Sequence, residues 1–109
     1  MYYIYVLKCT DNSLYTGITT DVKRRIAEHV SKAGQGAKYT RSHPPVSVQA
    51  VWSTEGRAAA SKLEYFIKSL TRTKKDELIK CPSLLSDKYS EKLSDCKFTY
   101  ESEYVCDIK

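Results

Sequence analysis

The chain has 109 residues and a formal net charge of +5, a length that suits one hydrophobic core rather than two. No run approaches the roughly 20 apolar residues of a membrane span, and no charged leader precedes an apolar N-terminal stretch as in a signal peptide. We therefore expect a protein that is not secreted and has no membrane partner: cytoplasmic, or nuclear if it comes from a virus of eukaryotes. The four cysteines show neither CxxC pairs nor histidines at zinc-finger spacing, so we interpret them as free thiols.

The positive charge is concentrated in the front part of the chain. Residues 1–80 hold 14 lysines and arginines against 7 acidic residues, whereas residues 81–109 hold 4 against 6. A basic field of this kind attracts phosphate backbones and raises the rate of encounter with nucleic acid. We expect a functional core over residues 1–80 and a C-terminal extension, 81–109, that packs on this core or extends it.

The first element is predicted to be a β-hairpin. Residues 2–9 are β-branched and aromatic, and the turn-forming residues 10–13 separate them from a second short run, Leu14 to Ile18. A helix over about residues 20–33 follows, in which Thr19 or Thr20 can act as the cap and Asp21 favours the positive end of the dipole. Its apolar residues recur at helical spacing: Val22, Ile26, Val30 and Ala33.

After a loop that starts at Gly34 and Gly36, alternating apolar residues predict a third strand over 46–52. Helix formers with one apolar face predict a helix over 57–70, and a short basic helix ends before Pro82. Residues 83–95 resemble a poor helix, and apolar residues at alternate positions of 98–108 resemble a half-buried strand. The fold class is therefore α/β (α+β): a small three-stranded, mainly antiparallel sheet flanked by about three helices, with a C-terminal extension.

Two charged residues of the first helix stand out on a helical wheel. At 100° per residue, Arg25 and His29 lie side by side on the shoulder of the apolar stripe, whereas Arg24 points away and suits a solvated charge. An arginine and a histidine in this position can hold a phosphate. The alternative is an exposed helix with an arginine whose apolar stem lies along the surface.

Glu64 occupies a similar shoulder on the helix over 57–70. A carboxylate beside core residues can coordinate a hard divalent cation, or it can pair with Lys68 one turn away. Tyr5 and Tyr15, taken alone, are ordinary strand tyrosines that pack on one face and show their hydroxyls to solvent.

In combination these segments resemble the GIY-YIG nuclease family over about residues 2–80. Tyr3-Ile4-Tyr5 stands for GIY and Tyr15-Thr16-Gly17 for YIG, with Tyr3 and Thr16 replacing a glycine and an isoleucine. Residues 20–29 and 60–68 match the family's arginine-bearing and glutamate-bearing helices. The loop 36–41 looks like the small stand-alone members, which consist of little more than the nuclease core.

The resemblance implies a role for each matched residue. Tyr5 and Tyr15 would line the site, Arg25 would hold the scissile phosphate, and His29 would assist proton transfer or substrate binding. Glu64 would bind one divalent cation, Mg²⁺ or Mn²⁺. Where the family often places an asparagine after the glutamate helix, this chain offers only Asp76.

The implied partner is DNA, single-stranded, duplex or branched, cut in a structure-selective or nonspecific way during repair or recombination. Basic and aromatic residues are expected to contact it: Lys8, Lys38, Tyr39, Arg41, Lys68, Arg72, Lys74 and Lys75. The main alternative is a non-catalytic nucleic-acid-binding module with a vestigial nuclease site. A third is a structural role in which the extension pairs with another subunit.

A joint role for Tyr5 and Tyr15 constrains the hairpin. In an antiparallel pair they share a face only if paired residue numbers have an even sum, as with Tyr5 opposite Gly17. We therefore predict a loop of odd length or a bulge near residues 10–13. As a base, a phenol with a pKa of about 10 needs nearby cations to lower that pKa, and Arg25, Lys8 and the metal could do so.

Overall fold

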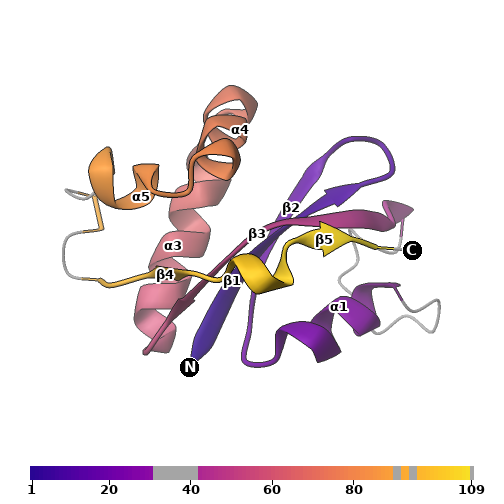
Figure 1. The fold of residues 1–109 in the computed structure, drawn as a ribbon, viewed down its shortest axis with the longest axis horizontal. Helices are drawn as coiled ribbons and strands as arrows, with labels where there is room; N and C mark the ends of the chain where they lie inside the picture. The colour runs from indigo at the N-terminus through magenta and orange to yellow at the C-terminus, as the bar shows by residue number, and fades with distance from the viewer. Residues whose placement is uncertain (31–41, 90–91, 94–95, 109) are drawn as a thin grey trace.

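The computed structural model describes residues 1–30, 42–89, 92–93 and 96–108. Its centre is an antiparallel sheet in which β1 (Tyr2–Cys9) lies between β2 (Leu14–Thr19) and β3 (Pro45–Thr54). Two short strands of the C-terminal extension pair with the far edge of β3. Figure 1 shows the sheet running through the middle of the molecule with helices on both sides.

Alternate residues of β1 face two separate cores. Ile4 and Val6 belong to the larger core, and Tyr5 and Leu7 belong to the smaller one. This division follows from the period of two along a strand, because both faces of β1 are covered. The helices are α1 (Val22–Val30), α3 (Arg57–Ser69), α4 (Arg72–Lys80) and α5 (Leu84–Asp87). Figure 1 places α1 on one side of the sheet and the other three on the opposite side.

The last hydrogen bond of the hairpin runs from the Cys9 N–H to the Ser13 carbonyl at 2.9 Å, and it encloses a turn of three residues, Thr10 to Asn12. Asn12 has a φ of 68°, the left-handed conformation that asparagine tolerates better than most residues. The register places Tyr5 opposite Gly17 and Leu7 opposite Tyr15. The prediction of an odd loop is confirmed, and both tyrosines lie on the α1 face.

Helix α1 begins with a different cap from the predicted one. Asp21 Oδ1 accepts a hydrogen bond from the Arg24 N–H at 3.1 Å, so Asp21 is the N-cap. Thr19, which we predicted as a cap, instead accepts a hydrogen bond from the Asp21 N–H at 3.0 Å. Thr20 makes neither of these contacts. The predicted end of this helix and the glycines after it lie outside the described residues.

The prediction of a three-stranded sheet is wrong, because the described residues form a five-stranded sheet. The predicted strand over 98–108 is divided into β4 (Thr99–Tyr100) and β5 (Cys106–Asp107), with a 3₁₀ turn, η1 (Ser102–Tyr104), between them. A register shift in β3 explains the interruption. Val6 pairs with Ala50 and Leu7 with Val48, which leaves Gln49 bulged. The extension leaves the ladder beside this bulge and rejoins it afterwards. The described helices number four rather than about three, because α5 adds one short turn.

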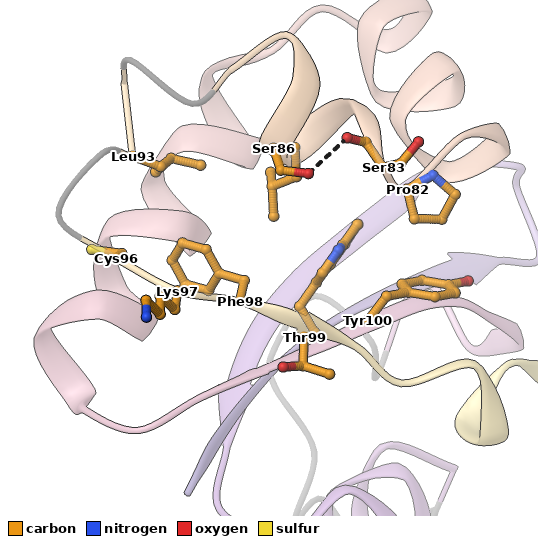
Figure 2. A pocket seen from close by; sticks show the side chains of 11 residues that line it. Pro82, Ser83, Ser86, Leu93, Cys96, Lys97, Phe98, Thr99 and Tyr100 are labelled. Carbon is orange, nitrogen blue, oxygen red and sulfur yellow. Dashed lines mark hydrogen bonds between the residues drawn. The ribbon is translucent and has the colours of Figure 1, made fainter.

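The extension also packs on the larger core. Leu85 and Leu93 are buried there with Trp52 and Leu63. A cleft of about 780 Å³ lies between α5 and β4, with Trp52 among its lining residues. In Figure 2 the labelled side chains of Pro82, Ser83 and Ser86 lie on one side of this cleft and those of Phe98, Thr99 and Tyr100 on the other. None of the predicted catalytic residues lines it.

All four cysteines are free thiols. Across the part of the chain that the structure describes, every helix is too short or too polar to span a membrane.

Candidate active site

Tyr5 is the buried centre of the site. It is 1 % exposed, and a Cβ atom at Gly17 would lie 2.6 Å from its Cζ atom, which is far inside van der Waals contact. The Tyr5 ring therefore crosses directly over the Gly17 backbone. Its hydroxyl then reaches Nε2 of His29 at 2.7 Å. Gly17 is thus required by close approach of a side chain rather than by an unusual backbone conformation.

His29 lies on the buried face of α1 and is neutral at pH 7. Burial and, to a smaller extent, the positive charge of Arg25 lower its pKa from 6.5 to about 4, and the negative charge of Glu28 partly opposes them. In a neutral imidazole one ring nitrogen carries no proton and can act as an acceptor. Burial likewise raises the pKa of Tyr5 to about 12, while a hydrogen bond with Arg25 lowers it in part. Arg25 thus acts on the pKa of Tyr5 in the expected direction, but in the protein without metal its effect is smaller than that of burial.

Tyr15 completes an aromatic cluster around the imidazole. Its ring lies edge to face with His29 at a centroid distance of 5.3 Å, and its centroid is 6.4 Å from that of Tyr5. The even register of the hairpin is what places both tyrosines on this side of β1 and β2. Such packing fixes the imidazole ring in one orientation.

Arg25 lies next to this cluster at the edge of solvent. Its Nη1 atom donates to Glu28 Oε1 at 2.9 Å, and the two side chains are 24 % and 30 % exposed. Sequence reasoning missed Glu28, although its position three residues after Arg25 is the spacing at which helix side chains meet. The ion pair holds the guanidinium beside Tyr5 in the protein without substrate.

Glu64 lies on α3 and is half-buried. Its negative charge contributes to the raised pKa of Tyr5, although α3 covers the opposite face of the sheet. Its Oε2 atom lies 3.4 Å from Lys68 Nζ, so the alternative pairing considered from the sequence is present. In the described parts of the chain no three His, Cys, Asp or Glu side chains converge as a metal site. A lone carboxylate still fits Mg²⁺, which commonly keeps several water ligands.

The residues predicted to contact DNA are only partly described. Lys38, Tyr39 and Arg41 lie outside the described residues, while Lys68 and Lys74 are exposed and Lys8 and Lys75 are half-buried. Arg72 donates to Asp76 at 3.0 Å and to the Asn12 carbonyl at 2.5 Å, and so ties α4 to the hairpin loop. Asp76, the residue offered in place of the family's asparagine, is thus held by Arg72.

The chain matches a protein family over most of its length. The family described as "GIY-YIG catalytic domain" matches residues 1–77. The chain belongs to the GIY-YIG family. The matched segment holds the tyrosines, the arginine, the histidine and the glutamate described above, together with Gly17.

The similar proteins are small stand-alone GIY-YIG members named UPF0213. One from Natronomonas pharaonis is 50 % identical over 78 residues, covering 72 % of this chain and 89 % of that protein. One from Clostridium perfringens is 42 % identical over 94 residues, covering 86 % of this chain and 99 % of that protein. A solution NMR structure of a UPF0213 protein from Bacillus halodurans is 46 % identical, covers 73 % of this chain and 84 % of its own, and has a TM-score of 0.48.

Two residues of this chain differ from the GIY and YIG motifs, and the structure shows where each of them packs. Tyr3 replaces the glycine of GIY, and its ring packs edge to face against Tyr104 of η1 at 5.8 Å. Thr16 replaces the isoleucine of YIG and is buried on the face opposite Tyr15.

Proposed function

We propose that this GIY-YIG chain is a metal-dependent DNA endonuclease that hydrolyses phosphodiester bonds in a structure-selective or nonspecific way. The observation that carries the proposal is the hydrogen bond of 2.7 Å between Tyr5 and a buried, neutral His29, with Arg25 beside it. Tyr5 and His29 come from separate elements, and both are desolvated at a cost to their charged forms. Buried titratable groups arranged in this way are typical of catalytic sites.

Arg25 would hold the scissile phosphate. When DNA binds, phosphate oxygens would replace the Glu28 carboxylate as the partner of the guanidinium. One anion then takes the place of another at a partly exposed position. A guanidinium fork binds two phosphate oxygens at once, and its charge stabilises the extra negative charge of the transition state.

Tyr5 and His29 would move the proton of the attacking water. With its proton on Nδ1, His29 accepts the Tyr5 hydroxyl hydrogen at Nε2 while the Tyr5 oxygen takes a proton from water. This relay needs no free phenolate, so it is compatible with a Tyr5 pKa of about 12.

Glu64 would hold the divalent cation in place of its contact with Lys68. When bound there, Mg²⁺ or Mn²⁺ supplies Lewis-acid stabilisation of phosphate oxygens and of the leaving group. Lys68 is then released at the edge of the site, where an ammonium group can contact a backbone phosphate.

The proposal is tested by incubating the purified chain with labelled single-stranded, duplex and branched DNA in Mg²⁺, Mn²⁺ or EDTA. We expect cutting that requires the metal. Arg25→Ala should lower the cleavage rate by about two to three orders of magnitude, whereas the control Lys23→Ala, an exposed charge on the same helix, should cut normally. Metal-independent cutting, or equal cutting by both variants, contradicts the proposal. Salt-sensitive binding with no cutting on any DNA would instead favour the binding module.

A further inference from the structure

A second, smaller cavity lies beside the candidate active site. It has a volume of about 360 Å³ and is bounded by α1, the end of β2 and the start of α3. Arg24, Arg25 and Arg57 line it together with one carboxylate, Glu28. Arg25 is common to this cavity and to the aromatic cluster of Tyr5 and His29, so the two sites adjoin.

The charges around this cavity are not balanced. Glu28 pairs with Arg25 at 2.9 Å, whereas no carboxylate of the described residues forms an ion pair with Arg24 or Arg57. Guanidinium groups that line one cavity repel one another. An anion that bridges Arg24 and Arg57 removes this cost, and the planar fork of arginine matches a phosphate.

The start of α3 adds to the positive potential. Arg57 is the first residue of this 13-residue helix. Its N-cap is Gly56, which has no side chain that could accept a hydrogen bond from the first turn. The backbone N–H groups of that turn therefore carry the positive end of the helix dipole toward the same region.

Arg57 also stands in a fixed relation to Glu64. The two residues are seven positions apart on α3, which places them on one helix face about 10.5 Å apart along the axis. Arg24 is likewise adjacent in sequence to Arg25. A phosphate bound by Arg24 and Arg57 would therefore lie beside the catalytic groups, where the next phosphate of the same nucleic-acid strand could be.

We infer that Arg24 and Arg57 form a second phosphate-binding subsite, which takes the backbone phosphate next to the scissile one. The inference rests on the proposed function for its substrate, and it gives Arg24, which is exposed as the sequence suggests, a phosphate to bind. The site thus selects a strand with a charged phosphate on its flank over an isolated phosphodiester.

A nuclear magnetic resonance titration tests the subsite without cleavage. In EDTA, inorganic phosphate added to ¹⁵N-arginine-labelled protein should shift the side-chain Nε signals of Arg24 and Arg57 more than that of Arg72, which is bound to Asp76. Sodium chloride at equal ionic strength should not reproduce the shifts. Equal responses of all three arginines would overturn the inference.

A pair of variants tests the subsite on DNA. Arg57→Gln should raise KM, or Kd in EDTA, about 10-fold with little change in kcat, whereas Lys62→Gln removes an exposed charge of α3 outside the cavity and should raise it far less. Equal effects of the two variants, on protein shown to be folded by circular dichroism, count against the subsite. If the wild-type chain cuts no DNA, the proposed function fails, while the phosphate titration and the Kd comparison still decide this inference.

Discussion

Gly17 and Tyr5 face each other across β1 and β2, and the tyrosine reaches His29 only because Gly17 has no side chain. Gly17→Ala should therefore push the ring away and reduce the free energy of unfolding by about 1–3 kcal/mol. Gly56→Ala is the steric control, since a Cβ atom there meets nothing within 4 Å, and it should cost only the smaller difference between glycine and alanine at an N-cap. Urea unfolding of both variants measures the difference. Equal stability of the two would show that the close approach at Gly17 carries no constraint.

The buried His29 makes stability depend on pH. Its pKa is about 4 in the folded state against 6.5 ordinarily, so as pH falls from 6.5 to 4 the unfolded chain takes up a proton that the folded chain resists. The free energy of unfolding should fall over this window by about 2–3 kcal/mol from His29 alone.

His29→Gln should lose this part of the pH dependence, while His43→Gln, at the surface, should keep it. Urea unfolding of wild type and both variants at pH 7 and pH 4.5 supplies the comparison. A wild-type slope in His29→Gln would mean that other groups account for the acid sensitivity.

For single residues, the sequence predicts which side chains lie together better than it predicts their pKa values. The helical wheel places Arg25 beside His29, and strand parity places Tyr5 with Tyr15, because both depend only on backbone periodicity. The direction in which the pKa of Tyr5 shifts depends on how deeply its hydroxyl is buried. The periodic pattern of the sequence does not give this depth. Arg57 escaped notice for a similar reason, since its cavity is assembled from three separate elements.

Helix α1 carries Arg25 and His29, and its first turn depends on Asp21. Asp21 Oδ1 accepts a hydrogen bond from the Arg24 N–H, so Asp21→Ala should cost about 1 kcal/mol of stability. Asp21→Asn keeps a capping oxygen and should cost less. Thermal unfolding followed by circular dichroism separates the two. Equal destabilisation by alanine and asparagine would attribute the effect to charge alone.

The long elements were predictable because their signals are local. The hairpin, the helix over 57–70 and the third strand have apolar periodicity over many residues, and the structure places β1, α3 and β3 there. Strands β4 and β5 have only two residues each, and they exist because the edge of β3 is open to them. The gap between β4 and β5 lies opposite the bulge at Gln49, which belongs to β3 and so leaves no signal in the sequence of the extension.

For the whole molecule, the extension supplies part of the larger core. Leu85 is 6 % exposed and packs in the cluster that contains Trp52. Leu85→Ala should lower the free energy of unfolding by about 2–4 kcal/mol, the usual cost of a cavity in a core. Val105→Ala, at a side chain that is 39 % exposed, is the control.

We further propose that the extension stabilises the fold without entering the chemistry, because Leu85 lies in the core on the face opposite Tyr5. Leu85→Ala should thus cut DNA at nearly the wild-type kcat at a temperature where it stays folded. Activity assays beside urea unfolding measure both effects. A large fall in kcat for the folded variant would assign the extension a catalytic part.

In the proposed site, Glu64 is the residue that links the metal to cleavage. The other acidic side chain near this cluster, Glu28, is bound to Arg25 at 2.9 Å, so Glu64→Ala should abolish metal-dependent cutting. DNA affinity should persist or increase, because a negative charge beside the phosphate is removed. Glu77→Ala, an exposed glutamate on α4, is the control.

The most direct measurement is Mn²⁺-dependent cutting and DNA affinity on one folded preparation of each protein, with circular dichroism to confirm the fold. We predict full cutting by wild type and Glu77→Ala, and none by Glu64→Ala despite intact binding. Wild-type-like cutting by Glu64→Ala would contradict the proposed site.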